Sequence, residues 1–228
     1  MPSSTQSVRH LTDDALPALA DGRDATNCLT QASSAVFDSI HRPDLNICIW
    51  QRPARLRISH EVANIADPKL DLRCATSAET FAADVPRLLT EAGLNPMHYP
   101  HWIEDLDSLA RRFFSEADGR EVLLRLETTD NDGCRRYHVD RSHLRLLCTY
   151  RGPGTEWLAN AQVDREALNT RATNERIARD GEPFRMEPFW VALFKGSLYP
   201  NMNESGLVHR SPPIDGTGTL RVRFCLDC

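Results

Sequence analysis

The chain has 228 residues, of which 41% are hydrophobic and 26% charged, and its formal net charge is −5. These values are ordinary for a folded domain, and the negative charge argues against nucleic acid or an anionic membrane surface as a partner. No run reaches the roughly 18–20 apolar residues that a membrane-spanning helix needs. The first thirty residues also lack the basic-then-apolar pattern of a signal peptide, so we expect a cytoplasmic protein without a membrane partner.

Composition along the chain predicts its organisation. Residues 1–30 are polar and small with no sustained period, which indicates a poorly ordered leader. Residues 31–228 are expected to form a single domain, with a helical portion over about 55–118 and a β-barrel core over about 120–228. Seven cysteines are an odd number, which in a cytoplasmic protein indicates thiols or metal ligands rather than disulfides.

Two amphipathic helices are predicted in the first half. Ser77 can cap a helix whose apolar side chains recur at i, i+4, i+7 and i+8 from Phe81, and Gly93 would end it. Pro100 opens a second helix with one broad apolar stripe, which ends near residues 118–119. A short apolar run at 45–50 suits a strand that precedes both helices.

From Glu121 onward the pattern is typical of β-structure. Residues 122–128 read as a strand, 130–133 as a hairpin turn and 136–140 as the returning strand. Further strands are expected at 144–150, 189–194, 206–209 and 219–227, with a loop or short helix within 160–182. Helices followed by strands indicate an α+β fold in which the helices pack on one side of the sheet.

The last predicted strand has two chemically different faces. Its apolar side chains alternate with polar ones, which are Arg221, Arg223, Cys225 and Asp227. Two arginines on one face need an anion or water. This polar face is therefore suited to the mouth of a barrel that is lined for a ligand.

A candidate metal site lies in the β region. His138 and Asp140 are separated by one residue, so on a strand both side chains point the same way, and His209 follows about seventy residues later. Two imidazoles and one carboxylate form a facial triad that leaves three positions open on iron(II). The alternative is a metal-free hydrogen-bonded cluster, although these groups are costly to bury without a compensating partner.

These residues resemble the double-stranded β-helix of iron(II)/2-oxoglutarate-dependent oxygenases, in which a His-x-Asp and a later His bind iron. The segment 191–196 resembles the strand and turn that lead to the distal histidine. The resemblance implies a cupin-like jelly-roll barrel with His138, Asp140 and His209 as metal ligands. It implies Arg221 as the anchor of the 2-oxoglutarate carboxylate, with Arg223 as the rival for that role.

Longer motifs are similar to the DUF1826 family, and the similarity extends from about Pro43 onward. They are the segments 137–140, 144–157, 195–196 and 209–213. This resemblance implies a link to metal homeostasis but no particular reaction.

Three further candidates surround the predicted site. Arg145 alternates with apolar neighbours and is expected to face the cavity, where it would hold Asp140 or a substrate anion. Cys134 lies four residues before His138 and is a possible additional ligand, which would favour zinc over iron. Cys225 and Cys228 have the spacing of a zinc knuckle, but no second pair matches them and they would point to opposite faces of a strand.

The sequence therefore predicts a metal-dependent protein with two alternative functions. The first is a mononuclear non-haem iron(II)/2-oxoglutarate-type oxygenase that acts on a small-molecule or unknown substrate. The alternative is a non-catalytic zinc-binding protein of metal homeostasis that uses the same pocket. A binding module for a small anion is a third class.

Overall fold

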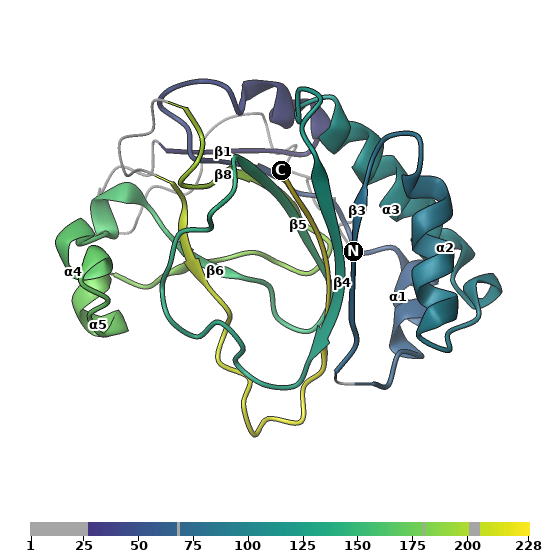
Figure 1. The fold of residues 1–228 in the computed structure, drawn as a ribbon. Coiled ribbons are helices and arrows are strands. Elements are labelled where there is room, and N and C mark those ends of the chain that lie inside the picture. Colours follow the sequence, from purple (N-terminus) through teal and green to yellow (C-terminus); the bar gives the residue numbers. More distant parts are fainter. Residues whose placement is uncertain (1–26, 68, 180, 201–205) are drawn as a thin grey trace, which may run out of the picture.

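Two β-sheets face each other, and helices cover the outer face of the larger sheet (Figure 1). This arrangement comes from a computed structural model that describes residues 27–67, 69–179, 181–200 and 206–228. The larger sheet has the strand order β1-β2-β8-β5-β10-β4-β3, and the smaller has the order β7-β6-β9. The strands of the larger sheet are β1 (Cys28–Gln31), β2 (Ile47–Trp50), β3 (Asp71–Thr76), β4 (Val122–Thr129), β5 (Leu144–Arg151), β8 (Val191–Lys195) and β10 (Arg221–Asp227).

The smaller sheet consists of β6 (Glu156–Leu158), β7 (Phe184–Arg185) and β9 (Val208–Arg210), and a single bridge between His138 and His209 extends it beyond β9. From β4 onward the chain passes back and forth between the sheets. In chain order the strands lie in the large sheet, the small-sheet bridge, then large, small, small, large, small and large. Eight positions in two facing sheets with this alternation form a double-stranded β-helix, a jelly-roll barrel. The predicted α+β class and barrel are confirmed.

The helical segments are α1 (Leu56–Ala63), α2 (Phe81–Glu91), α3 (Pro100–Phe114), α4 (Arg165–Asn169) and α5 (Asn174–Ile177), with short 3₁₀ turns at Ser34–Ser39, Pro96–His98 and Asn160–Gln162. The helices α1, α2 and α3 pack on the apolar outer face of the large sheet, whereas α4 and α5 pack against the small sheet (Figure 1). Phe81 and Phe113 from the helices share one buried cluster with Leu124 and Phe224 from the sheet. No helix in the described ranges is long and apolar enough to cross a membrane.

Successive side chains of β10 point to opposite faces of the large sheet. Val222, Phe224 and Leu226 join the helix-facing core, whereas Cys225 packs in a second cluster with Trp157 of the small sheet. The predicted division of this strand into an apolar and a polar face is confirmed. Its polar face therefore points into the space between the two sheets.

The predicted hairpin over 122–140 is wrong. β4 pairs with β3 on one side and β10 on the other, so neither edge of β4 is free for residues 136–140. The chain instead crosses to the small sheet, where His138 alone pairs with His209 through two 3.0 Å backbone hydrogen bonds.

Three other boundaries differ from the prediction. The strand β3 lies within the predicted helical portion. β1 begins inside the predicted leader, while residues 1–26 lie outside the described part of the chain. The helix predicted to be capped by Ser77 begins at Phe81 with Thr80 as its N-cap, and the Ser77 hydroxyl instead contacts Glu79.

Candidate metal centre

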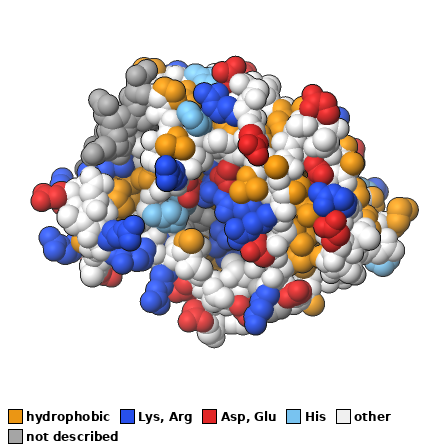
Figure 2. Space-filling model, viewed as in Figure 1, with side chains coloured by type: hydrophobic (Ala, Val, Ile, Leu, Met, Phe, Trp, Pro, Cys, Tyr) orange, Lys and Arg blue, Asp and Glu red, His pale blue; other side chains and the backbone are white. Residues whose placement is uncertain are grey.

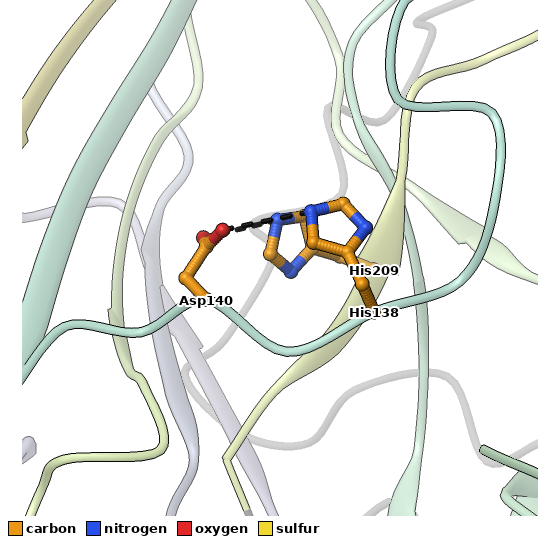
Figure 3. Close-up of side chains that lie close together, drawn as sticks. All are labelled: His138, Asp140 and His209. Carbon is orange, nitrogen blue, oxygen red and sulfur yellow. Dashed lines mark ion pairs between the residues drawn. The ribbon is translucent and has the colours of Figure 1, made fainter. Parts of the chain in front are cut away.

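His138, Asp140 and His209 converge between the two sheets (Figure 3). One potential ligand atom from each residue lies within 4.8 Å of the others. Nε2 of His138 is 3.5 Å from Oδ1 of Asp140, and Nε2 of His209 is 3.2 Å from Oδ2. This is the set of two imidazoles and one carboxylate that the sequence predicted, and it suits an open facial metal site.

Backbone carbonyls orient both imidazole rings. Nδ1 of His138 lies 2.8 Å from the carbonyl oxygen of Arg136, and Nδ1 of His209 lies 3.2 Å from that of Leu207. A carbonyl only accepts hydrogen bonds, so in each neutral ring the proton belongs on Nδ1. Both Nε2 lone pairs are then directed towards Asp140, where a metal would bind.

Asp140 lies in a loop rather than on a strand, and the turn after β8 holds this loop in place. Backbone N–H groups of Ser197 and Leu198 donate to the carbonyls of Asp140 and Ser142 at 2.8 and 3.0 Å. Gly196 permits this close approach, because a Cβ there would lie 2.3 Å from the Ser142 carbonyl oxygen. A side chain at position 196 would therefore displace the loop that carries the carboxylate.

Charges around the triad favour the anionic form of Asp140 and shift the pKa values of the two histidines in opposite directions. Burial alone would raise the pKa of Asp140, but His209, His138 and Arg145 together hold it well below its usual value. Burial lowers the pKa of His209, and the neighbouring Asp140 only partly offsets this effect. Burial opposes charging of His138 as well, but Asp140 and the Arg136 carbonyl outweigh it and raise that pKa.

The triad lines a cavity of about 210 Å³ that is rich in arginine. Figure 2 shows basic side chains gathered at the centre of this face of the molecule, next to a histidine. Five arginines and two carboxylates are among the lining residues, which are Arg73, Arg125, Glu127, Cys134, His138, Asp140, Arg145, Leu147, Thr155, His209, Arg210, Ser211, Arg223 and Cys225. The scattered arginines of the sequence are thus brought together by the fold.

Arg145 contacts the candidate ligand directly. It forms ion pairs with Asp140 and with Asp227, and its side chain is largely buried. The sequence left two partners open for Arg145, Asp140 or a substrate anion. The structure shows the contact with Asp140. This guanidinium fixes the position of the carboxylate and keeps it anionic.

Arg221 is fully buried and incompletely paired. Its Nε donates to the carbonyl of Pro153 at 2.8 Å, and one Nη lies 3.4 Å from the hydroxyl of Thr155, which lines the cavity. Among the described residues, none accepts a hydrogen bond from its other Nη. Burial, together with the nearby charge of Arg223, lowers the pKa of Arg221 to about 9. An incoming carboxylate would stabilise this guanidinium.

Arg223 lines the cavity itself and is already ion-paired. It donates to Glu127 at 2.9 Å, and within the described chain its Nε has no hydrogen-bond partner. The structure therefore brings both predicted carboxylate-binding arginines to the cavity region, with Arg221 touching it through Thr155.

The cysteines take different positions. Cys134 lines the cavity and is exposed, but it is not among the described residues whose ligand atoms meet within 4.8 Å. Cys225 lines the same cavity, whereas Cys228 lines a separate surface pocket near Tyr199. Because they face different spaces, Cys225 and Cys228 do not form a joint metal site.

Sequence reasoning missed Arg73, Arg125 and Arg210 as lining residues. Arg73 and Arg125 lie directly opposite each other on β3 and β4, and Arg210 follows the distal histidine on β9. For Arg210 the adjacent His209 was an available signal. For Arg73 none existed, because β3 was not predicted.

A double-stranded β-helix with a His-x-Asp and a distal His between its sheets defines the class of cupin-like barrels with a candidate mononuclear metal centre. Within that class the chain belongs to the family described as "Protein of unknown function (DUF1826)", whose model matches residues 31–227. No curated protein matches the chain.

Among solved structures, similar ones include oxygenases. Rice dioxygenase for auxin oxidation has 13% identity over 88% of this chain and 81% of its own, with a TM-score of 0.47. The 2-oxoglutarate binary complex of dioxygenase for auxin oxidation 1 from Arabidopsis thaliana has 12% identity over 86% and 78%, with a TM-score of 0.45. A Pseudomonas putida prolyl-4-hydroxylase has 11% identity over 76% and 93%, with a TM-score of 0.35.

Proposed function

We propose that this protein is an iron(II)/2-oxoglutarate-dependent oxygenase. The proposal rests on one observation: two sets of polar groups lie in one cavity region, and each is suited to bind a partner from outside the chain. His138, Asp140 and His209 converge as a ligand set, and the buried guanidinium of Arg221 has one Nη for which the described chain provides no acceptor. The first suits a metal ion and the second suits a carboxylate.

The residues fit both groups on chemical grounds. Two Nε2 atoms and one carboxylate oxygen would hold the metal, with the rings fixed by the Arg136 and Leu207 carbonyls. Three such ligands leave the remaining positions free for a keto acid and oxygen. Arg221 would bind the far carboxylate of 2-oxoglutarate, supported by Thr155 and the Pro153 carbonyl. Arg145 would keep Asp140 anionic and in place.

Bound iron(II) would supply the oxidative decarboxylation of 2-oxoglutarate by O₂ to succinate and CO₂, with the second oxygen atom inserted into the other substrate. The residues of the chain would then position the substrates and exclude water from the site. The ligand-bearing face lies between two sheets, where His209 is buried and His138 remains partly accessible from the cavity mouth.

The test is 2-oxoglutarate turnover by purified protein reconstituted with iron(II). We expect succinate to form, at least slowly without a second substrate, and to be absent for His138→Ala. The matched control is His101→Ala, which removes a histidine that also faces a carboxylate, Glu61, but lies outside the cavity. Absence of succinate under every condition, with the site filled by zinc, would contradict the proposal.

A second candidate function rests on Cys134. Its place in the cavity wall offers a thiolate near the triad, and a set of Cys, His and Asp ligands favours zinc. The protein would then hold zinc without catalysis, as in metal homeostasis. Metal content measured before and after Cys134→Ser separates the two, because only a zinc site that uses the thiolate loses metal on this substitution.

A further inference from the structure

A second basic wall of the cavity has no task in the proposed function. Arg73 on β3 and Arg125 on β4 face each other directly across the strand pair and both line the cavity. Like charges at directly opposed positions destabilise a sheet unless other groups compensate for them. Asp71 and Glu127, paired in the neighbouring row, compensate in part by contacting Arg73.

This compensation is incomplete. Arg125 is mostly buried and forms an ion pair with Asp227, but within the described part of the chain its Nε has no hydrogen-bond partner. A buried guanidinium N–H without an acceptor has lost its hydration without replacement. The half-exposed Arg73 beside it leaves the wall open to solvent and thus to a ligand.

The cavity wall is rich in guanidinium groups. Five arginines line it, and each lies within ion-pair distance of a carboxylate; these carboxylates belong to Asp71, Glu127, Asp140, Glu156 and Asp227. Neighbouring residues therefore balance the charge of the wall. What remains for an external anion is the buried N–H of Arg125 for which the described residues offer no acceptor.

The Arg73–Arg125 wall adjoins Arg145 and Arg223 but lies apart from Arg221, the first candidate for the co-substrate anchor. Arg125 and Arg145 both contact Asp227, and Arg73 and Arg223 both contact Glu127. Arg221 lies four residues along β10 from Cys225, the neighbour of Arg125, which is about 13 Å at 3.3 Å per residue.

We propose that Arg73 and Arg125 bind an anionic group, a carboxylate or a phosphate, of the substrate that is oxidised. The substrate is thus a small acidic molecule, held by its anion at β3 and β4 with the rest of it extending towards the metal ligands. That the bound molecule is a substrate rests on the proposed function. The anion site itself does not depend on that function.

The test is calorimetric titration of the full-length, metal-free protein with two probes, inorganic phosphate and succinate. The variants are Arg125→Gln, Arg73→Gln and Arg221→Gln. Arg87→Gln is the matched control, because Arg87 is as exposed as Arg73 and likewise contacts two carboxylates, but lies on α2 outside the cavity. Since no metal is present, the outcome is independent of any turnover.

We expect at least one probe to bind, with its Kd raised about tenfold by Arg125→Gln and severalfold by Arg73→Gln, as for a lost charge-assisted hydrogen bond. Arg87→Gln should leave that Kd within twofold, and Arg221→Gln should raise it less than Arg125→Gln does. The probe that binds more tightly identifies the anion as phosphate or carboxylate. If neither probe binds, or if binding weakens only in Arg221→Gln, the proposal is overturned. Arg73 is half exposed, so its variant remains informative if Arg125→Gln fails to fold.

Discussion

The large sheet carries one arginine cluster on each face, and the two clusters differ in how completely they are paired. On the helix side, both Nη atoms of Arg52 contact the Asp105 carboxylate at 2.6 and 2.7 Å, and its Nε donates to the Phe189 carbonyl. Tyr150 donates to the same carboxylate at 2.6 Å. On the cavity side, Arg125, Arg221 and Arg223 each keep a buried N–H for which the described residues offer no acceptor.

This difference separates a structural role from a binding role. A buried charge persists in a core only when its hydrogen bonds are satisfied, as those of Arg52 are. Each of these three cavity-side guanidinium groups keeps one such N–H for an anion from outside, although Arg125 and Arg223 are already ion-paired. The helix-side cluster should therefore affect stability alone, and the cavity-side cluster should affect ligands first.

The largest expected effect is on the helix side. Asp105→Ala leaves Arg52 buried without its counter-charge, so it should lower the free energy of unfolding by about 3–5 kcal/mol. Urea denaturation measures this loss. Glu91→Ala, which removes an exposed carboxylate from Arg87, is the control and should cost less than about 1 kcal/mol. Equal losses of unfolding free energy in the two variants would contradict a structural role for the buried Arg52–Asp105 pair.

The next effect is on metal binding. Removing a group that hydrogen-bonds a metal ligand typically reduces metal affinity about 10–100-fold, so losing the ligand itself in His209→Ala should reduce it by at least about 100-fold. The rise in Tm on adding metal to the apoprotein should disappear, while His101→Ala keeps it. A metal-dependent Tm shift that survives in His209→Ala would show that the ion binds elsewhere.

A smaller effect distinguishes the two rival arginines. Arg221→Gln should weaken 2-oxoglutarate binding to the metal-loaded protein about tenfold or more, and it should not lower stability, because it removes a buried charge that lacks full pairing. Arg52→Gln, by contrast, should be strongly destabilising. If Arg223→Gln weakens binding and Arg221→Gln does not, the anchor is Arg223.

Much of the candidate site was visible in the sequence because its signals are local. The His-x-Asp spacing, the alternation along residues 220–227 and the helix that begins at Pro100 each depend on near neighbours. The hairpin prediction failed because turn residues at 130–133 do not reveal that both edges of β4 are occupied by β3 and β10. His138 and Asp140 nevertheless converge, although Asp140 is in a loop.

The sequence did not predict how distant segments pair or in which register. Arg73 and Arg125 are opposed only because β3 pairs with β4, and Arg52 meets Asp105 only because α3 packs over the sheet. These pairings depend on tertiary packing, for which no short-range pattern exists. Both arginine clusters therefore emerged only from the fold.

The most direct test of the central claim is anaerobic titration of the iron(II)-loaded protein with 2-oxoglutarate, followed by visible absorption. We predict that one equivalent produces a new absorption band, because the keto acid joins the metal held by His138, Asp140 and His209. The band should be absent in His209→Ala and should require more 2-oxoglutarate in Arg221→Gln. A wild-type protein that takes up iron(II) but shows no spectral response to saturating 2-oxoglutarate would contradict the account.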